Sequence, residues 1–203
     1  MPFSDCFSCY KVSDSFSIFE TDCVKDLGVF IDKKLNWNFH INHITSKARQ
    51  VCAWIFSVFY TRDVTTMLTL FKSLVRSKLE YCSNIWNPFL KVNIIKLESI
   101  QRSFTSRLDG MKDFDYWERL LKLNLESLQR RREKHLIITV WKIKNNAIPN
   151  SFNLSFRETK HTGAIKAVLK PLPKVKGRVL TLYEESFIIT SAKLWNILPS
   201  IVT

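Results

Sequence analysis

Two pairs of residues have spacings at which proteins bind zinc. Cys6 and Cys9 form a Cys-x-x-Cys pair, and His40 and His43 form a His-x-x-His pair. About 30 residues separate the two pairs. A Cys2His2 finger has roughly 12 residues in that interval and roughly three to five between its histidines. We therefore predict no metal site and no cofactor.

The carboxylates are also poorly arranged for catalysis. Asp26 and Asp32 flank a predicted strand, and a second group, Asp109, Asp113 and Asp115, follows a predicted helix. These are positions typical of turn and cap residues. No histidine or lysine stands at the spacing of a nuclease site, and the chain contains no Asp-Asp pair. Four glycines and four histidines, placed as they are, allow neither a Gly-rich phosphate loop nor a Ser-His-Asp arrangement. The sequence thus predicts no catalytic residue.

Positive charge is the strongest chemical signal. The chain has 31 Lys and Arg against 18 Asp and Glu, a formal net charge of +13. Such an excess repels itself in a compact state and usually matches an anionic partner, which is a nucleic acid, an acidic protein or an anionic lipid. Taken singly, any one cation also fits an ordinary solvated surface. Candidates for phosphate contacts on predicted helix faces are Lys47, Arg49, Lys72, Arg76, Lys78, Arg102 and Arg107.

A run of three arginines concentrates this charge. Arg130, Arg131 and Arg132 lie in a predicted helix and point in three directions, so that one or two of them can face the same phosphate track. The alternative is a helix that packs through the aliphatic stems of its arginines. Both interpretations stay open at this stage.

A second basic stretch lies nearer the C-terminus. Residues 159–183 contain six Lys or Arg, no acid, and two prolines. This pattern predicts an extended basic loop or weak hairpin, with residues 167–169 and 178–182 as possible strands. The stretch suits contact with RNA or DNA, but also a solvated linker or a nuclear-targeting signal. Its candidate residues are Lys166, Lys170, Lys174, Lys176 and Arg178.

Composition favours packed helices in a reducing compartment. The 203 residues are 46% hydrophobic, with four Gly, six Pro and six Trp, which is enough for a real core. Five cysteines form an odd set without a recognisable signal peptide, so we expect reduced thiols and an intracellular protein of the nucleus or cytoplasm. No apolar run approaches the roughly 20 residues of a membrane span. We therefore predict that the protein does not associate with membranes.

The periodicity of apolar residues changes along the chain and predicts a mainly α fold. Residues 1–36 alternate as two or three short strands or a β-hairpin, and residues 37–110 predict three helices of a bundle. Residues 111–148 predict two connecting helices. Residues 149–203 predict a smaller α region with the basic loop and a terminal amphipathic helix over 185–198. The break at residues 147–151 is the predicted domain boundary.

Several motifs occur in a fixed order over about 175 residues. They resemble the thumb and C-terminal region of the reverse transcriptase of non-LTR, LINE-type retrotransposons, closest to the jockey-like group. The motifs are Leu27-Gly28-Val29 with Asp32, Leu35, Trp37 and His40-Ile41; Tyr81-Cys82 and Trp86-Asn87-Pro88; Gln101-Arg102 with Phe104-Thr105; Tyr116 with Glu118-Arg119-Leu120; Leu125 with Ser127-Leu128 and Arg131-Arg132; and Trp195-Asn196 with Leu198-Pro199.

This resemblance implies the nucleic-acid-holding part of a polymerase without its active site. The family's paired metal-binding aspartates should precede residue 1, and nothing in residues 1–23 replaces them. Two-metal phosphoryl transfer needs those carboxylates, so we expect no catalysis by this chain alone. Residues 1–36 would be a remnant of palm-edge strands, and residues 37–110 a thumb that tracks the phosphates of RNA or an RNA/DNA duplex. Two alternatives remain: a helical module that binds an acidic protein, and a decayed reading frame without a selected function.

Overall fold

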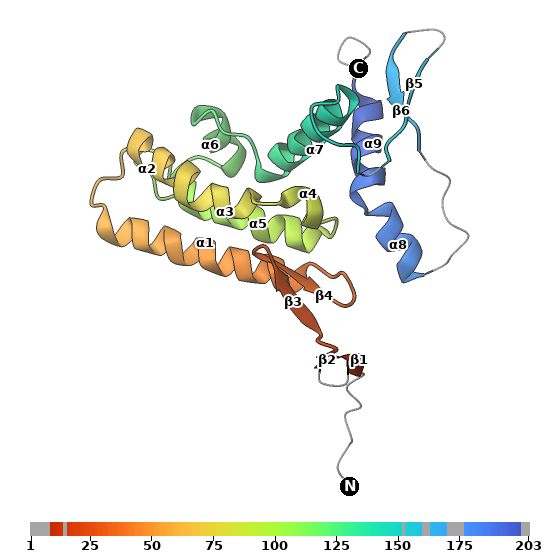
Figure 1. The fold of residues 1–203 in the computed structure, drawn as a ribbon. Helices are drawn as coiled ribbons and strands as arrows, with labels where there is room; N and C mark the ends of the chain where they lie inside the picture. Colours follow the sequence, from red (N-terminus) through yellow and green to blue (C-terminus); the bar gives the residue numbers. More distant parts are fainter. Residues whose placement is uncertain (1–8, 14–15, 152, 160–162, 170–176, 200–203) are drawn as a thin grey trace.

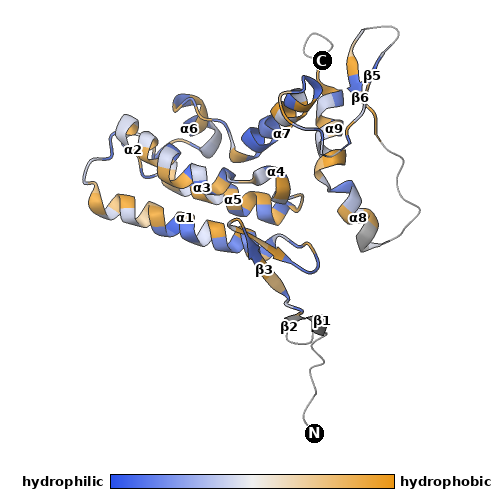
Figure 2. Ribbon diagram, viewed as in Figure 1, coloured by the Kyte–Doolittle hydropathy of each residue, from blue (hydrophilic) through white to orange (hydrophobic). Residues whose placement is uncertain are grey.

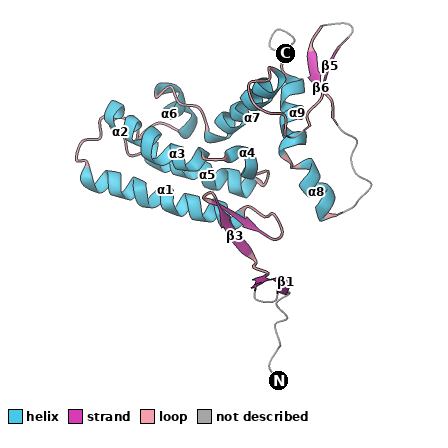
Figure 3. Ribbon diagram, viewed as in Figure 1, coloured by secondary structure: helices cyan, strands magenta, loops and turns pink. Residues whose placement is uncertain are grey.

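The computed structural model describes residues 9–13, 16–151, 153–159, 163–169 and 177–199, with the backbone alone for residues 9–13, 16–18, 178 and 179. Helices dominate this part of the chain, and short antiparallel strand pairs lie before the first helix and between α7 (Leu128–Lys144) and α8 (Arg178–Glu184) (Figure 3). The predicted mainly α fold with N-terminal strands is confirmed. None of the described helices combines the length and the apolar character needed to cross a membrane.

Two hairpins open the fold. Strand β1 (Cys9–Ser13) pairs with β2 (Phe16–Phe19), and β3 (Cys23–Asp26) pairs with β4 (Val29–Asp32). The second hairpin turns over two residues with positive φ, Leu27 at 43° and Gly28 at 88°, as a type I′ turn requires. Val29 of β4 is buried and joins the helical core, so this hairpin is held against the bundle.

Helix α1 (Asn38–Val58) begins where the sequence predicts the change to helical period. Its buried stripe repeats every three or four residues and includes Ile41, Ile44, Ala48 and Ile55. The stripe packs against α5 (Lys91–Thr105) and the segment that follows α1 (Figure 1). The predicted first helix is therefore confirmed in position and in buried face.

The predicted second helix is wrong as a single element. Asp63 caps its start as expected, accepting a hydrogen bond from the Thr66 N–H. The helix ends after Glu80, because Cys82 adopts a left-handed conformation with φ of 51°, and the Trp86 indole donates to the Tyr81 carbonyl at 2.8 Å. This kink buries Trp86 completely. The resulting elements are α2 (Val64–Leu70), the π-helical turn η1 (Phe71–Arg76), α3 (Ser77–Glu80) and α4 (Ser83–Trp86).

Two capped helices follow. Asp115 forms a capping box with Glu118 at the start of α6 (Tyr116–Lys122), and Ser127 caps α7 (Leu128–Lys144). The buried Glu98 of α5 connects the first residues of these two helices. Its Oε1 accepts hydrogen bonds from the Leu128 N–H at 3.2 Å and from the Tyr116 hydroxyl. The connecting helices predicted for residues 111–148 are present.

The C-terminal region packs strands against a helix. Strand β5 (Phe156–Glu158) pairs with β6 (Ile165–Ala167), and β6 contacts α9 (Phe187–Ile197). Residues 178–182, predicted as a strand, instead lie in helix α8 (Arg178–Glu184). Its alternation of apolar residues is too short to distinguish a strand from a buried helix segment, and no neighbouring strand pairs with it in the described chain.

The apolar residues form two clusters joined by α7. The first cluster runs from Val29 to Leu128, whereas the second contains Val140, Ile143, Ala192 and Trp195. Figure 2 shows apolar residues in orange and polar residues in blue alternating along the helices. Because the second cluster joins Val140 and Ile143 to Ala192 and Trp195, apolar packing continues across the predicted boundary at residues 147–151.

Candidate nucleic-acid interface

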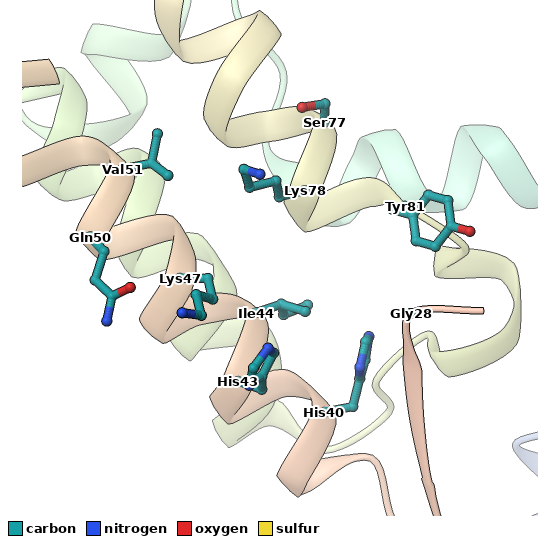
Figure 4. A pocket seen from close by; sticks show the side chains of 10 residues that line it. All are labelled: Gly28, His40, His43, Ile44, Lys47, Gln50, Val51, Ser77, Lys78 and Tyr81. Carbon is teal, nitrogen blue, oxygen red and sulfur yellow. The ribbon is translucent and has the colours of Figure 1, made fainter. Parts of the chain in front are cut away.

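A basic groove lies between α1 and α3 and ends at the tip of the second hairpin (Figure 4). Its cavity has a volume of about 390 Å³. Two lysines, one from each helix, line it, and its lining includes no aspartate or glutamate. We call this site the basic groove, and its lining residues are Gly28, His40, His43, Ile44, Lys47, Gln50, Val51, Ser77, Lys78 and Tyr81.

Local structure explains why both lysines face the groove. Ile44 and Ala48 are buried in the α1 stripe, so Lys47, between them in sequence, lies at its solvent edge. On the opposite wall Leu79 is fully buried, and the adjacent Lys78 is exposed. Two lysine side chains thus line one cavity from two helices, an arrangement that suits successive phosphates of a nucleic-acid strand.

The hairpin tip closes one end of the groove. The Tyr81 hydroxyl donates a hydrogen bond to the Leu27 carbonyl at 3.0 Å, which joins the end of α3 to the turn of the hairpin. A β-carbon built on Gly28 would lie 3.6 Å from the Tyr81 ring, an ordinary contact. Lack of space is therefore not the reason for glycine at this position. The reason is the backbone: φ of 88° is a conformation that glycine adopts without strain.

His40 is the buried polar residue of the groove. Its Nδ1 accepts a hydrogen bond from the Phe30 N–H at 3.3 Å, so the neutral ring carries its proton on Nε2. Burial, with a smaller contribution from the charge of His43, lowers the pKa of His40 to about 4. The Nε2 atom is buried without a hydrogen-bond partner among the described residues. A donor at the wall of the basic groove thus has no acceptor in the described part of the chain.

The opposite flank of α1 carries a second basic site, between α1 and α5. This α1–α5 hollow has a volume of about 220 Å³ and is lined by Arg49, Arg107, Ser99 and Ser103 among others. Arg49 Nη2 lies 3.4 Å from the Ser99 hydroxyl, and the Arg107 guanidinium lies 5.1 Å from the centre of the Phe56 ring. The hollow combines guanidinium and hydroxyl donors, which suit phosphate oxygens.

The cysteine of this hollow is not an activated nucleophile. Burial raises the pKa of the Cys52 thiol to about 11, which outweighs the lowering effect of the nearby Arg107 charge. The thiol is therefore protonated at neutral pH, and a nucleophilic role would need the thiolate. The hollow offers binding groups and no catalytic cysteine.

Helix α1 forms a ridge between the two basic sites. It contains no aspartate or glutamate over its 21 residues. Lys47 flanks the ridge on the groove side and Arg49 on the hollow side. Its solvent-facing side chains include the small or uncharged polar groups Asn42, Ser46, Gln50, Ala53 and Ser57, together with the exposed apolar side chains of Phe39, Trp54 and Val58. A polyanion can therefore lie along α1 without meeting a carboxylate of that helix.

The other predicted cations of the bundle lie apart from these two sites. Lys72 is exposed on η1. Arg76 is half-buried, and burial, then the charge of Arg131, lowers its pKa. Arg102 is exposed with its guanidinium 4.8 Å from the centre of the Tyr116 ring. None of the three lines the basic groove or the α1–α5 hollow.

The arginine run is divided by burial. Arg130 is exposed, 3.7 Å from Glu126. Arg131 binds both carboxylate oxygens of Glu80, at 2.5 and 2.9 Å, and this contact raises its pKa. Arg132 is only 1% exposed, so the prediction that it contacts a surface ligand is wrong. It lies inward because the helix places Leu128, Arg132 and Leu136 on one buried face.

The C-terminal basic residues are also partly structural. The Lys166 ammonium donates to the carbonyls of Asn196 and Leu198 at 2.9 and 3.2 Å, which satisfies the C-terminal end of α9. Arg178 begins α8. Lys170, Lys174 and Lys176 lie outside the described residues, so their predicted role stays a prediction.

The zinc pattern is not assembled in the described structure. His40 uses Nδ1 to hold the Phe30 backbone, and Cys6 lies outside the described residues. Among the described residues, no group of three or more His, Cys, Asp or Glu side chains could hold a metal ion.

Sequence reasoning did not select several residues of the basic groove as site residues. His40, His43 and Gln50 share the three- to four-residue spacing of Lys47, and this periodicity places them on one flank of α1. Tyr81 stands out in the sequence only through the Tyr81-Cys82 motif, because its place at the end of α3 was not predicted.

Comparisons with known proteins add one relative. The chain is 29% identical over 147 residues to "Uncharacterized protein B0403.1" of Caenorhabditis elegans, an alignment that spans 64% of this chain and 74% of the relative. No protein-family model matches the chain. No solved structure matches it either. The chain is thus similar over most of its length to a nematode protein of uncharacterised function.

Proposed function

We propose that this chain binds RNA or an RNA/DNA duplex through the phosphate backbone, with little dependence on base sequence and without catalysis. The observation that carries this proposal is the pair of basic sites on the two flanks of the acid-free helix α1. Phosphate contacts position a nucleic acid and carry no direct sequence information. A surface that offers cations and small polar groups fits this kind of binding.

Four cations form the proposed contact set: Lys47 and Lys78 from the basic groove, and Arg49 and Arg107 from the α1–α5 hollow. Four phosphate contacts correspond to a slope of about −3 to −4 for the logarithm of the binding constant against the logarithm of salt concentration. Arg131 and Arg132 are not in the set, because Glu80 pairs with the first and the core buries the second.

The proposed origin is the thumb and C-terminal region of a LINE-type reverse transcriptase. Its support is that the motif residues stand at junctions of the fold. Leu27-Gly28 forms the hairpin turn, Trp37 stands at the N-cap of α1, and Trp86 is buried beyond the end of α3. A thumb holds its duplex through helix faces, and the proposed interface on α1 is such a face.

Fluorescence anisotropy of a labelled RNA/DNA hybrid across a range of salt concentrations tests the proposal. The double substitution Lys47→Gln with Lys78→Gln should weaken binding by about 10- to 50-fold at 0.1 M salt and reduce the steepness of the salt slope by about 2. Both side chains are exposed, so the variant should fold as the wild type does.

Lys193→Gln with Lys91→Gln is the matched control, because it removes the same charge from exposed positions outside both basic sites. It should weaken binding much less than the groove variant. Equal losses in the two double variants would show that net charge alone attracts the ligand. Binding that is insensitive to salt would contradict the proposal as a whole.

A further inference from the structure

One donor in the basic groove lacks an acceptor. His40 is 2% exposed, its Nδ1 is occupied by the Phe30 N–H, and its Nε2–H has no hydrogen-bond partner among the described residues. Buried donors without partners are uncommon and cost about 1–3 kcal/mol. Figure 4 shows the ring extending from α1 toward Gly28 and Tyr81, at the end of the groove. An acceptor placed at this end of the groove would satisfy this donor.

The same end of the groove presents an acceptor. The Tyr81 hydroxyl uses its proton to bond the Leu27 carbonyl, which leaves its oxygen lone pairs. The neighbouring Cys82 side chain raises the pKa of Tyr81, so the phenol keeps that proton at neutral pH. Tyr81 is 53% exposed and lines the groove. A donor and an acceptor thus stand at one end of the cavity.

We infer that this end of the basic groove receives a ribose 2′-hydroxyl, so that the chain prefers an RNA strand to a DNA strand of the same sequence. A hydroxyl accepts one hydrogen bond and donates another, which matches His40 Nε2–H and the Tyr81 oxygen. The 2′-hydroxyl is the group that distinguishes RNA from DNA. This inference rests on the proposed function and names the strand that the groove selects.

Charge and polarity argue against a phosphate at this end. The imidazole is neutral, and the lone pairs of the Tyr81 oxygen would repel an anionic oxygen. The lysines instead lie farther along the groove, as Figure 4 shows for Lys47 and Lys78. A strand can then place its phosphates beside the lysines and a sugar hydroxyl beside His40.

Competition binding with four single strands of one sequence tests the inference: RNA, DNA, 2′-fluoro-DNA and 2′-O-methyl-RNA. RNA should bind about 10-fold more tightly than DNA, the effect of two neutral hydrogen bonds. The 2′-fluoro strand should behave as DNA because it cannot donate, and the 2′-O-methyl strand should lose the preference because the methyl group replaces the donated proton.

Two substitutions of His40 separate its structural bond from the proposed contact. In His40→Asn the amide oxygen can keep the bond to the Phe30 N–H, but the side chain is too short to place a donor in the groove. In His40→Gln the amide nitrogen reaches the position of Nε2. We expect His40→Asn to reduce the RNA-to-DNA ratio to about 2 or less, and His40→Gln to retain most of it.

Tyr81→Phe provides an independent variant at an exposed position, and it should also lower the ratio to about 2. Equal binding of RNA and DNA by the wild-type chain, or an unchanged ratio in both His40→Asn and Tyr81→Phe, would overturn the inference. The proposed function would survive that result if binding stayed salt-dependent and sensitive to Lys47 and Lys78. Absence of salt-dependent binding to either strand would overturn both.

Discussion

The side-chain amide of Asn196 pairs with the backbone of Ala167 in the manner of a neighbouring β-strand. Its Nδ2 donates to the Ala167 carbonyl at 3.0 Å, and its Oδ1 accepts from the Ala167 N–H at 2.9 Å. Beside it, the Trp195 indole donates to the Ile165 carbonyl at 2.8 Å. One dipeptide of α9 therefore covers the free edge of β6 and fixes the C-terminal cluster.

Asn196→Leu should destabilise the C-terminal cluster. The substitution leaves the N–H and carbonyl of the buried Ala167 without partners, which costs about 2–4 kcal/mol for the two groups together. Urea denaturation followed by tryptophan fluorescence measures the change in unfolding free energy. Ile197→Ala is the control, because that side chain is 79% exposed and should change stability by less than about 0.5 kcal/mol. Equal effects would show that the Asn196 bonds contribute nothing.

Glu80→Gln should lower stability without weakening nucleic-acid binding directly. The pair with Arg131 is largely withdrawn from solvent, with side-chain exposures of 11% and 25% for Glu80 and Arg131. Removing its negative partner leaves a half-buried guanidinium, at a cost of about 1–3 kcal/mol. Thermal unfolding and hybrid binding, measured on the same preparation, separate the two effects. Glu126→Gln, which affects the exposed Arg130, should cost less than about 1 kcal/mol.

Stability should fall below pH 6.5 because of His40. Its pKa is about 4 in the folded chain against 6.5 as its ordinary value, so the unfolded state binds more protons between these values. The stability that depends on neutral His40 is fully present above pH 6.5 and is lost as the pH falls toward 4. The free energy of unfolding should fall by up to about 2–3 kcal/mol over this range.

Denaturant unfolding at pH 7, 5.5 and 4 measures this dependence. His40→Asn should show a shallower decline over the same range, because asparagine does not titrate. An identical decline in both proteins would assign the acid sensitivity to other groups, such as the carboxylates.

Leu27→Asn should stabilise the hairpin beside the groove. Leu27 has φ of 43°, a left-handed conformation that leucine adopts at a cost, and its side chain is 83% exposed. Asn-Gly is a preferred pair for a type I′ turn, so the gain should be about 0.5–1 kcal/mol. The Tyr81 hydroxyl donates to the backbone carbonyl of residue 27, so the variant keeps this hydrogen bond. Leu27→Ala, which retains the strain, should bring no comparable gain in the thermal midpoint.

Local sequence determined most helices and several of their ends. The apolar stripe of α1, the Asp63 cap of α2 and the position of α7 were predictable because helical period and capping are properties of neighbouring residues. The absence of paired aspartates and the excess of positive charge are likewise readable without a structure.

Tertiary structure decided which charges are available. Lys47 and Lys78 are 31 positions apart, and only the packing of α3 on α1 brings them to one groove. The packing of α7 on α4 and α5 likewise buries Arg132, while Arg130, two residues earlier, stays exposed. The left-handed conformation of Cys82 was not predictable, because it depends on the burial of Trp86. Helix α8 was not predictable either, because contacts with distant elements override the local preference of its residues. Local pattern thus specifies the cations, and long-range packing selects those that can meet a partner.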